Sequence, residues 1–167
     1  MVSTPKLKTP VIRESKINHK SGVLHPLVRF VTEETAALLF NLDPDEIYRI
    51  DCWQHVVYIH GKGVSKFVSY ADFPPILEVE APTHQDFVRW RKRWKNRWKI
   101  SQAPEFWTKF YKHQFKQAST ETHLLAWGKL VAVVKSVLSV AAVEQLREAY
   151  RYEKDLWKTF RKRKSRG

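Results

Sequence analysis

The chain has 167 residues, 43% of them apolar and 13% aromatic, which is enough for one moderate domain or two small ones with a buried core. Its 30 Lys and Arg residues outnumber 17 Asp and Glu, and the net charge of +13 favours nucleic acid, an anionic membrane surface or an acidic protein as partner. Because Cys52 is the only cysteine, an internal disulfide and a four-thiolate zinc site are excluded.

The charge is distributed unevenly along the chain. Residues 1–32 carry six cations and one acid, residues 33–86 carry three cations and ten acids, and residues 87–167 carry 21 cations and six acids. An acidic centre is therefore joined to a basic half. We expect a basic flexible arm (1–22), an acidic module of helix and strands (23–82), a basic helical bundle (83–160) and a basic tail (161–167).

Nothing in the sequence has the length and hydrophobicity of a membrane segment. The first 20 residues are polar and basic without the apolar core of a signal peptide. The longest apolar run, 124–146, is interrupted by Gly128, Lys129, Lys135 and Glu144. These features predict a soluble, cytoplasmic protein without a membrane span.

The first predicted elements are the arm and one short helix. Residues 1–22 contain two prolines and five cations, a composition typical of an extended or disordered segment. Thr32 is a suitable N-cap for a helix over 33–41, which the sequence Asn41-Leu-Asp-Pro-Asp ends.

Strands are predicted next, because β-branched and aromatic residues dominate 46–53, 55–60 and 64–70. We expect a three-stranded antiparallel meander in which Gly61 and Gly63 supply the positive φ of a tight hairpin. Two prolines within 72–75 end the sheet, and residues 76–82 form a further short edge strand or a linker.

The remainder is predicted to be helical. Thr83 can cap a cationic helix that runs to Lys99, and further helices are expected over 105–117 and 123–138. The 123–138 helix is apolar on nearly every side and is expected to be the most buried. Ser139 is a predicted N-cap for a fourth helix that frays into the tail. The predicted fold class is α+β: a short helix and a small three-stranded antiparallel meander, followed by a basic bundle of about four helices.

The cationic helix combines two residue types on different sides. Its aromatic residues recur every three or four positions and share one face: Phe87, Trp90, Trp94 and Trp98. A stacking platform for bases would use such a face, but four large aromatics in water would form a sizeable apolar patch. We therefore predict that the aromatics pack in the core and that the cations face the ligand.

The candidate nucleic-acid-binding residues form two clusters. The helix contributes Arg89, Arg91, Lys92, Arg93, Lys95, Arg97 and Lys99, and the tail contributes Arg161, Lys162, Arg163 and Lys164. A looser third group comprises Lys6, Lys8, Arg13, Lys16 and Lys20. Seven cations in eleven positions without an intervening acid are unusual for an ordinary solvated helix face, which interleaves Glu.

Motifs for catalysis or metal binding are not found. Strands flank Gly61-Lys62-Gly63, whereas phosphate-binding glycine loops precede a helix. His55 and His60 are five residues apart and fall on opposite faces of a strand, so they do not chelate together. We predict no enzyme activity, no cofactor and no metal.

These observations favour a non-catalytic protein that binds DNA or RNA largely through phosphates and therefore tolerates many sequences. The acidic meander is expected to face a protein partner or another copy of the chain. The main alternative is an interaction adaptor, or a small subunit of a larger assembly, that docks on an acidic protein surface, because Arg and Trp are also enriched at protein interfaces. Attachment to a membrane surface is a third possibility, although the aromatic stripe is narrow for it.

Overall fold

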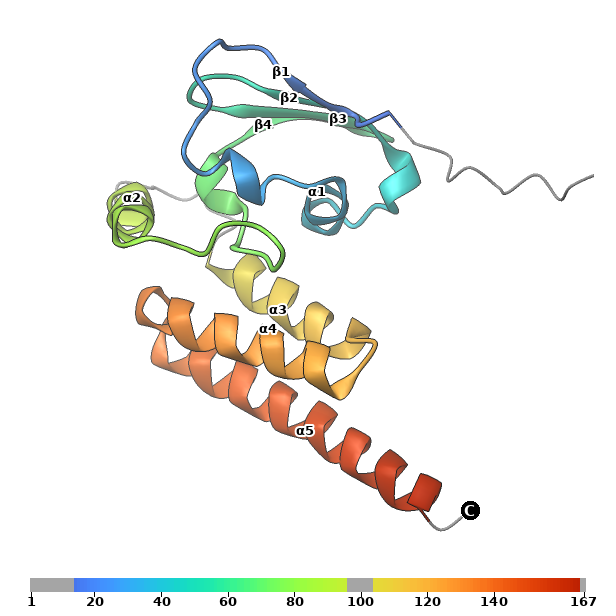
Figure 1. The fold of residues 1–167 in the computed structure, drawn as a ribbon. Helices are drawn as coiled ribbons and strands as arrows, with labels where there is room; N and C mark the ends of the chain where they lie inside the picture. The colour runs from blue at the N-terminus through green and yellow to red at the C-terminus, as the bar shows by residue number, and fades with distance from the viewer. Residues whose placement is uncertain (1–13, 96–103, 166–167) are drawn as a thin grey trace, which may run out of the picture.

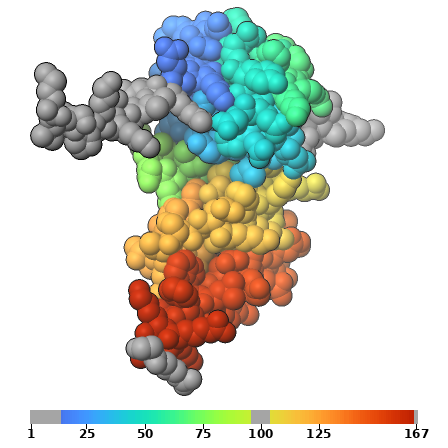
Figure 2. Space-filling model, turned by 90° about the vertical axis from the view of Figure 1, so that its right-hand side faces the viewer, coloured from blue at the N-terminus to red at the C-terminus, as the bar shows by residue number. Residues whose placement is uncertain are grey.

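The structure, a computed structural model, describes residues 14–95 and 104–165. It is a mixed α+β fold in which a four-stranded sheet lies above a stack of helices (Figure 1). The space-filling view shows the same order, with the sheet and the segments around it (residues 14–82, the sheet module) at one end of the molecule and the C-terminal helix at the other (Figure 2). Among the described residues, no helix combines the length and apolar character that a membrane crossing requires.

The sheet contains the three predicted strands and one more. Its strands are β1 (Ile17–His19), β2 (Ile47–Cys52), β3 (Val57–Gly61) and β4 (Val64–Val68), paired in that order. The pairs β2–β3 and β3–β4 are antiparallel as expected. However, β1 pairs with β2 in parallel, so the prediction of a purely antiparallel meander is wrong.

Strand β1 lies inside the segment predicted to be an arm. It joins the sheet through backbone hydrogen bonds, with Ile50 N–H donating to the Lys16 carbonyl (2.9 Å) and Lys20 N–H donating to the Cys52 carbonyl (2.9 Å). A strand of three residues with one apolar side chain has no alternating pattern, so periodicity does not reveal it.

One face of the sheet forms the upper core. Ile47, Ile50, Val57 and Ile59 are fully buried, and helix α1 (Glu33–Leu39) lies beneath them (Figure 1). Thr32 caps α1 as predicted, since Thr35 N–H donates to Thr32 Oγ1 (3.0 Å). No described element covers the opposite face (Figure 1).

Only one of the two hairpin glycines has the predicted conformation. Gly63 has φ of +71°, which suits a tight turn between β3 and β4. Gly61 does not have a positive φ, so that part of the prediction is wrong. A Cβ at Gly61 would lie 2.8 Å from the Glu46 carbonyl oxygen, and glycine is therefore required for close backbone approach.

The helices that follow are α2 (His84–Lys95), α3 (Glu105–Gln117), α4 (Glu121–Val134) and α5 (Val140–Ser165). A short 3₁₀ helix, Lys135–Val137, follows α4. Ser139 caps α5 as predicted, with Ala142 N–H donating to Ser139 Oγ (3.1 Å). The prediction that this helix frays into the tail at Arg161 is wrong, because α5 remains helical to Ser165.

Helix α3, and not α4, is the central helix. Its buried residues include Phe106, Trp107, Phe110, Tyr111 and Phe115, and it packs against α1, α4 and α5. Leu125 and Val133 of α4 are exposed. Helix α4 packs against α3 and α5, and these contacts leave part of its apolar surface exposed.

Trp90 joins α2 to the rest of the core. Its side chain is 0% exposed. Its ring packs edge-on against Trp107 (5.2 Å between centroids) and Phe87 (5.4 Å). It also lies 6.1 Å from the ring of Phe30, which precedes α1. One side chain therefore contacts the sheet module and the helical stack together.

We expect Trp90→Ala to lower the free energy of unfolding by about 3–5 kcal/mol, because a large buried aromatic is replaced by a cavity. Chemical denaturation followed by circular dichroism measures the change. Trp53→Ala is the matched control, since the Trp53 side chain is 44% exposed and its loss is expected to cost less than about 1 kcal/mol. Equal effects of the two variants would contradict the central position of Trp90.

Candidate nucleic-acid interface

A network around Asp86 fixes the start of α2. Thr83 and Asp86 form a reciprocal cap, in which Thr83 N–H donates to Asp86 Oδ2 (2.9 Å) and Asp86 N–H donates to Thr83 Oγ1 (3.2 Å). The carboxylate also forms ion pairs with Arg29 and, at 3.1 Å, with Arg89. Thr83 was the predicted cap of this helix, and this is confirmed.

Arg29 extends this network to the sheet module. Its guanidinium donates to the carbonyls of Glu80 (3.0 Å) and Ala81 (3.2 Å) as well as to Asp86. Burial opposes ionisation of Asp86, but the hydrogen bonds from Arg29 and Thr83 outweigh it, and the pKa of this carboxyl lies below its usual value. The stability that Asp86 contributes is therefore present at neutral pH and is lost as the pH falls through this lowered pKa.

The aromatic residues set the rotation of α2 about its axis. Trp90 is buried, Phe87 and Trp94 are partly buried against the core, and Trp94 Nε1 donates to the Ala71 carbonyl (3.4 Å). The prediction that the aromatics of this helix pack inward is confirmed for these three residues. Trp98 lies outside the described residues.

The cations of α2 fall into two groups. Arg89 is partly buried and ion-paired with Asp86, so it has a structural role. Arg91, Lys92, Arg93 and Lys95 are exposed. Within residues 14–95 and 104–165, Arg91, Lys92 and Lys95 form no ion pair. The predicted site residues Arg97 and Lys99 lie outside the described residues, as do Lys6, Lys8 and Arg13.

A cleft of about 300 Å³ separates α2 from the sheet module. Arg93 spans it, donating from Nε to Ser69 Oγ (3.3 Å) and from Nη2 to the His55 carbonyl (3.5 Å). Its walls combine three cations with polar and aromatic groups: Arg89, Lys92, Arg93, His25, His55, Ser69 and Tyr70. The size and positive charge of this cleft suit a phosphate group.

His25 is held neutral in this cleft. Its ring stacks on Tyr70 with 4.1 Å between centroids and 6° between planes, and its Nδ1 accepts from Leu27 N–H (3.0 Å). Burial, followed by the charges of Arg89 and Arg93, lowers the pKa of His25 to about 4. With His25 neutral, the positive charges that line the cleft are those of Arg89, Lys92 and Arg93.

The tail cations do not join this surface. Arg161, Lys162, Arg163 and Lys164 lie at the exposed end of α5, far from α2 and the sheet (Figures 1 and 2). Arg161 forms an ion pair with Glu121 (2.8 Å). The two predicted clusters are therefore separate surfaces.

Sequence reasoning missed Arg29, His25, Ser69 and Tyr70. They lie far from α2 along the chain, and no spacing rule connects them to it. Arg29 and Asp86, for example, are 57 positions apart. The sequence indicates only that Arg29 is basic and not which residues it contacts.

The described residues contain no cluster of three or more His, Cys, Asp or Glu side chains that would hold a metal ion. Cys52 is buried in β2, where burial raises the pKa of its thiol. No protein-family model matches the chain, and neither a curated protein nor a solved structure is significantly similar to it.

We expect His25 in the folded protein to titrate near pH 4, well below its ordinary value of 6.5. Protonation of His25 then opposes folding, so its effect is absent above pH 6.5 and stability is lost as the pH falls from 6.5 towards 4. Arg93→Gln removes a nearby positive charge and is expected to raise this pKa. NMR titration of the histidine ring protons measures both values.

Arg147→Gln is the control for this titration, because Arg147 lies on α5 and is not among the groups that shift His25. A His25 pKa near 6.5 in the unmodified protein, or an equal rise in both variants, would contradict the described cleft.

Proposed function

We propose that the protein binds nucleic acid without catalysing a reaction, mainly through phosphate contacts from the exposed face of α2. The observation that carries this proposal is the division of α2, in which the aromatic residues pack inward while Arg91, Lys92 and Lys95 are exposed without ion pairs among the described residues. Cations without acidic partners are free to meet phosphates, and displacement of counterions from the polymer then drives binding. Such contacts tolerate many sequences.

The cleft beside α2 supports the same function. A phosphate seated between Lys92 and Arg93 would meet two positive charges and the Ser69 hydroxyl. Because Arg93 already contacts both Ser69 and the His55 carbonyl, its guanidinium is preorganised for this contact.

A protein partner on the acidic module remains a prediction, but less of that module's charge is available than its composition indicates. Asp51 and Asp72 are buried, and Glu46 forms an ion pair with Lys62 (3.3 Å). These acids stabilise the module itself.

The second candidate function is an adaptor that docks on an acidic protein surface. The observation that favours it is a row of exposed apolar side chains on α5, Tyr152, Leu156 and Phe160, spaced four residues apart among cations. A helix face of this kind is typical of protein contacts. Binding to an acidic protein without binding to any nucleic acid would favour this function.

We expect the combined change Arg91→Gln, Lys92→Gln and Lys95→Gln to weaken binding of a single-stranded oligonucleotide at least about tenfold at low salt. The slope of log affinity against log salt is expected to become shallower by about two, at about 0.7 per lost phosphate contact. Fluorescence anisotropy at several salt concentrations measures both quantities.

The matched control changes Lys129, Lys135 and Arg147 to Gln together. These exposed cations lie on or beside α4 and α5. Their substitution removes the same amount of charge from another face of the molecule. Equal losses in the two triple variants would indicate only a general effect of net charge. Absence of binding to DNA and RNA at low salt would overturn the proposed function.

We expect the tail variant Lys162→Gln, Arg163→Gln and Lys164→Gln to leave the affinity for a short oligonucleotide of about four nucleotides within about twofold. Helix α5 has 26 residues and is therefore about 39 Å long, so a strand of about four nucleotides bound to α2 is too short to reach the tail. Longer strands are expected to lose affinity in this variant. A large loss with the short strand would show that the tail and α2 form one surface.

A further inference from the structure

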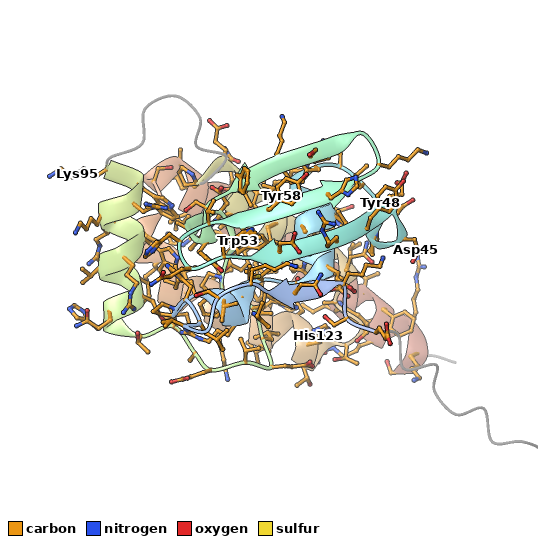
Figure 3. The ribbon with its side chains drawn as sticks, turned by 90° about the horizontal axis from the view of Figure 1, so that it is seen from above. Asp45, Tyr48, Trp53, Tyr58, Lys95 and His123 are labelled. Carbon is orange, nitrogen blue, oxygen red and sulfur yellow. The ribbon has the colours of Figure 1, made fainter. Side chains whose placement is uncertain are left out.

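The uncovered face of the sheet carries aromatic side chains. Tyr48 is 55% exposed and Phe67 is 65% exposed. Tyr58 and Phe67 are cross-strand partners on β3 and β4 with 5.0 Å between ring centroids, and Tyr48 contacts the His60 ring edge-on at 5.4 Å. In Figure 3 this face is turned towards the viewer, with Tyr48 and Tyr58 above the strands.

Several polar groups of this face contact one another, and the exposed rings of Tyr48 and Phe67 are the aromatic surface that a ligand would meet. Asp51 forms an ion pair with Arg49 (3.0 Å) and accepts from Asn18 Nδ2 (3.4 Å). The Tyr58 hydroxyl bonds to Ser65, and the Arg49 guanidinium lies over the Tyr58 ring at 5.8 Å from its centroid. The face is thus nearly neutral, and the charge of Asp51 does not oppose a polyanion.

The aromatic face continues towards α2. The β2–β3 turn carries the exposed Trp53, and its His55 carbonyl accepts from Arg93 of α2. Viewed from above, Lys95, Trp53, Tyr58 and Tyr48 follow one another from α2 to the far end of the sheet (Figure 3). A cationic helix and an aromatic surface therefore lie next to each other.

We propose that this sheet face stacks on unpaired bases of a single-stranded nucleic acid whose phosphates lie on the cations of α2. The proposal rests on the proposed function and names its substrate class. Aromatic rings beside a cationic track are the arrangement that single-stranded polymers require, because each base offers a flat face and each phosphate a charge. One common class of RNA-binding module stacks two or three bases on the open face of a four-stranded sheet.

The length of the sheet face along its strands suits two or three stacked bases. Strand β2 has six residues, which corresponds to about 20 Å of extended chain. A duplex does not suit the surface, because its bases are already stacked on each other and present only their edges in the grooves. We therefore expect single strands to bind more tightly than duplexes of the same length and salt.

The experiment measures the affinity of Tyr48→Ala and Phe67→Ala for fluorescein-labelled oligo(dT) and oligo(U) of about 12 nucleotides, with a duplex of equal length as comparison. Each change is expected to weaken single-strand binding by about 5- to 150-fold, the range for loss of one stacked base. The salt slope is expected to stay unchanged, because no phosphate contact is lost. The triple α2 variant changes that slope.

Two further variants separate stacking from general apolar contact. Phe67→Tyr keeps an aromatic face and is expected to retain binding, whereas Phe67→Leu keeps apolar area without the ring and is expected to lose it. Phe160→Ala removes an equally exposed aromatic from α5 and is expected to leave the affinity unchanged. Circular dichroism confirms that each variant is folded.

The outcomes distinguish the two proposals. Loss of binding in the triple α2 variant with no effect of Tyr48→Ala and Phe67→Ala overturns the stacking surface and leaves phosphate binding intact. Equal affinity for duplex and single strand also overturns it. Failure of the unmodified protein to bind either polymer overturns both proposals.

Discussion

Burial of Trp90 is the constraint on which the rest of this structure depends. A fully buried indole that contacts Phe30, Phe87 and Trp107 allows α2 only one rotation about its axis. Since five of the last seven residues of α2 are Lys or Arg, that rotation decides which cations reach solvent. The same contacts hold the sheet module against the helical stack. Core packing and the binding surface that we propose are therefore two consequences of one helix orientation.

The network of Arg29, Thr83 and Asp86 complements this packing at the N-terminal end of α2. An aromatic core sets rotation, whereas a hydrogen-bonded carboxylate sets where the helix begins and how it meets the sheet module. Arg89 supports the carboxylate and Arg93 spans the cleft, so two cations of the basic run help to build the surface. The basic run thus contains residues that support the structure and residues that remain available to a ligand, although composition treats them alike.

Much of the fold was predictable because it follows from local signals. The 105–117 helix begins and ends where its pattern predicts, and Thr32, Thr83 and Ser139 cap the helices that they were expected to cap. Three strands were recognised from β-branched and aromatic residues. Strand β1 was missed because parallel pairing of three residues depends on a distant strand. The position of α3 at the centre was missed for a related reason, since apolar content says how much surface a helix can bury but not which neighbours surround it.

The sequence by itself determined that α2 has an aromatic side and a cationic side, because helical periodicity depends only on the spacing of residues along one element. It also determined that the tail and the N-terminal segment carry two further groups of basic residues. Only the tertiary structure decided that the tail lies far from α2, that His25, Ser69 and Tyr70 meet Arg93 at a cleft, and that one sheet face stays uncovered. These are contacts between distant segments, and their geometry is decided by how the layers pack and not by any local propensity.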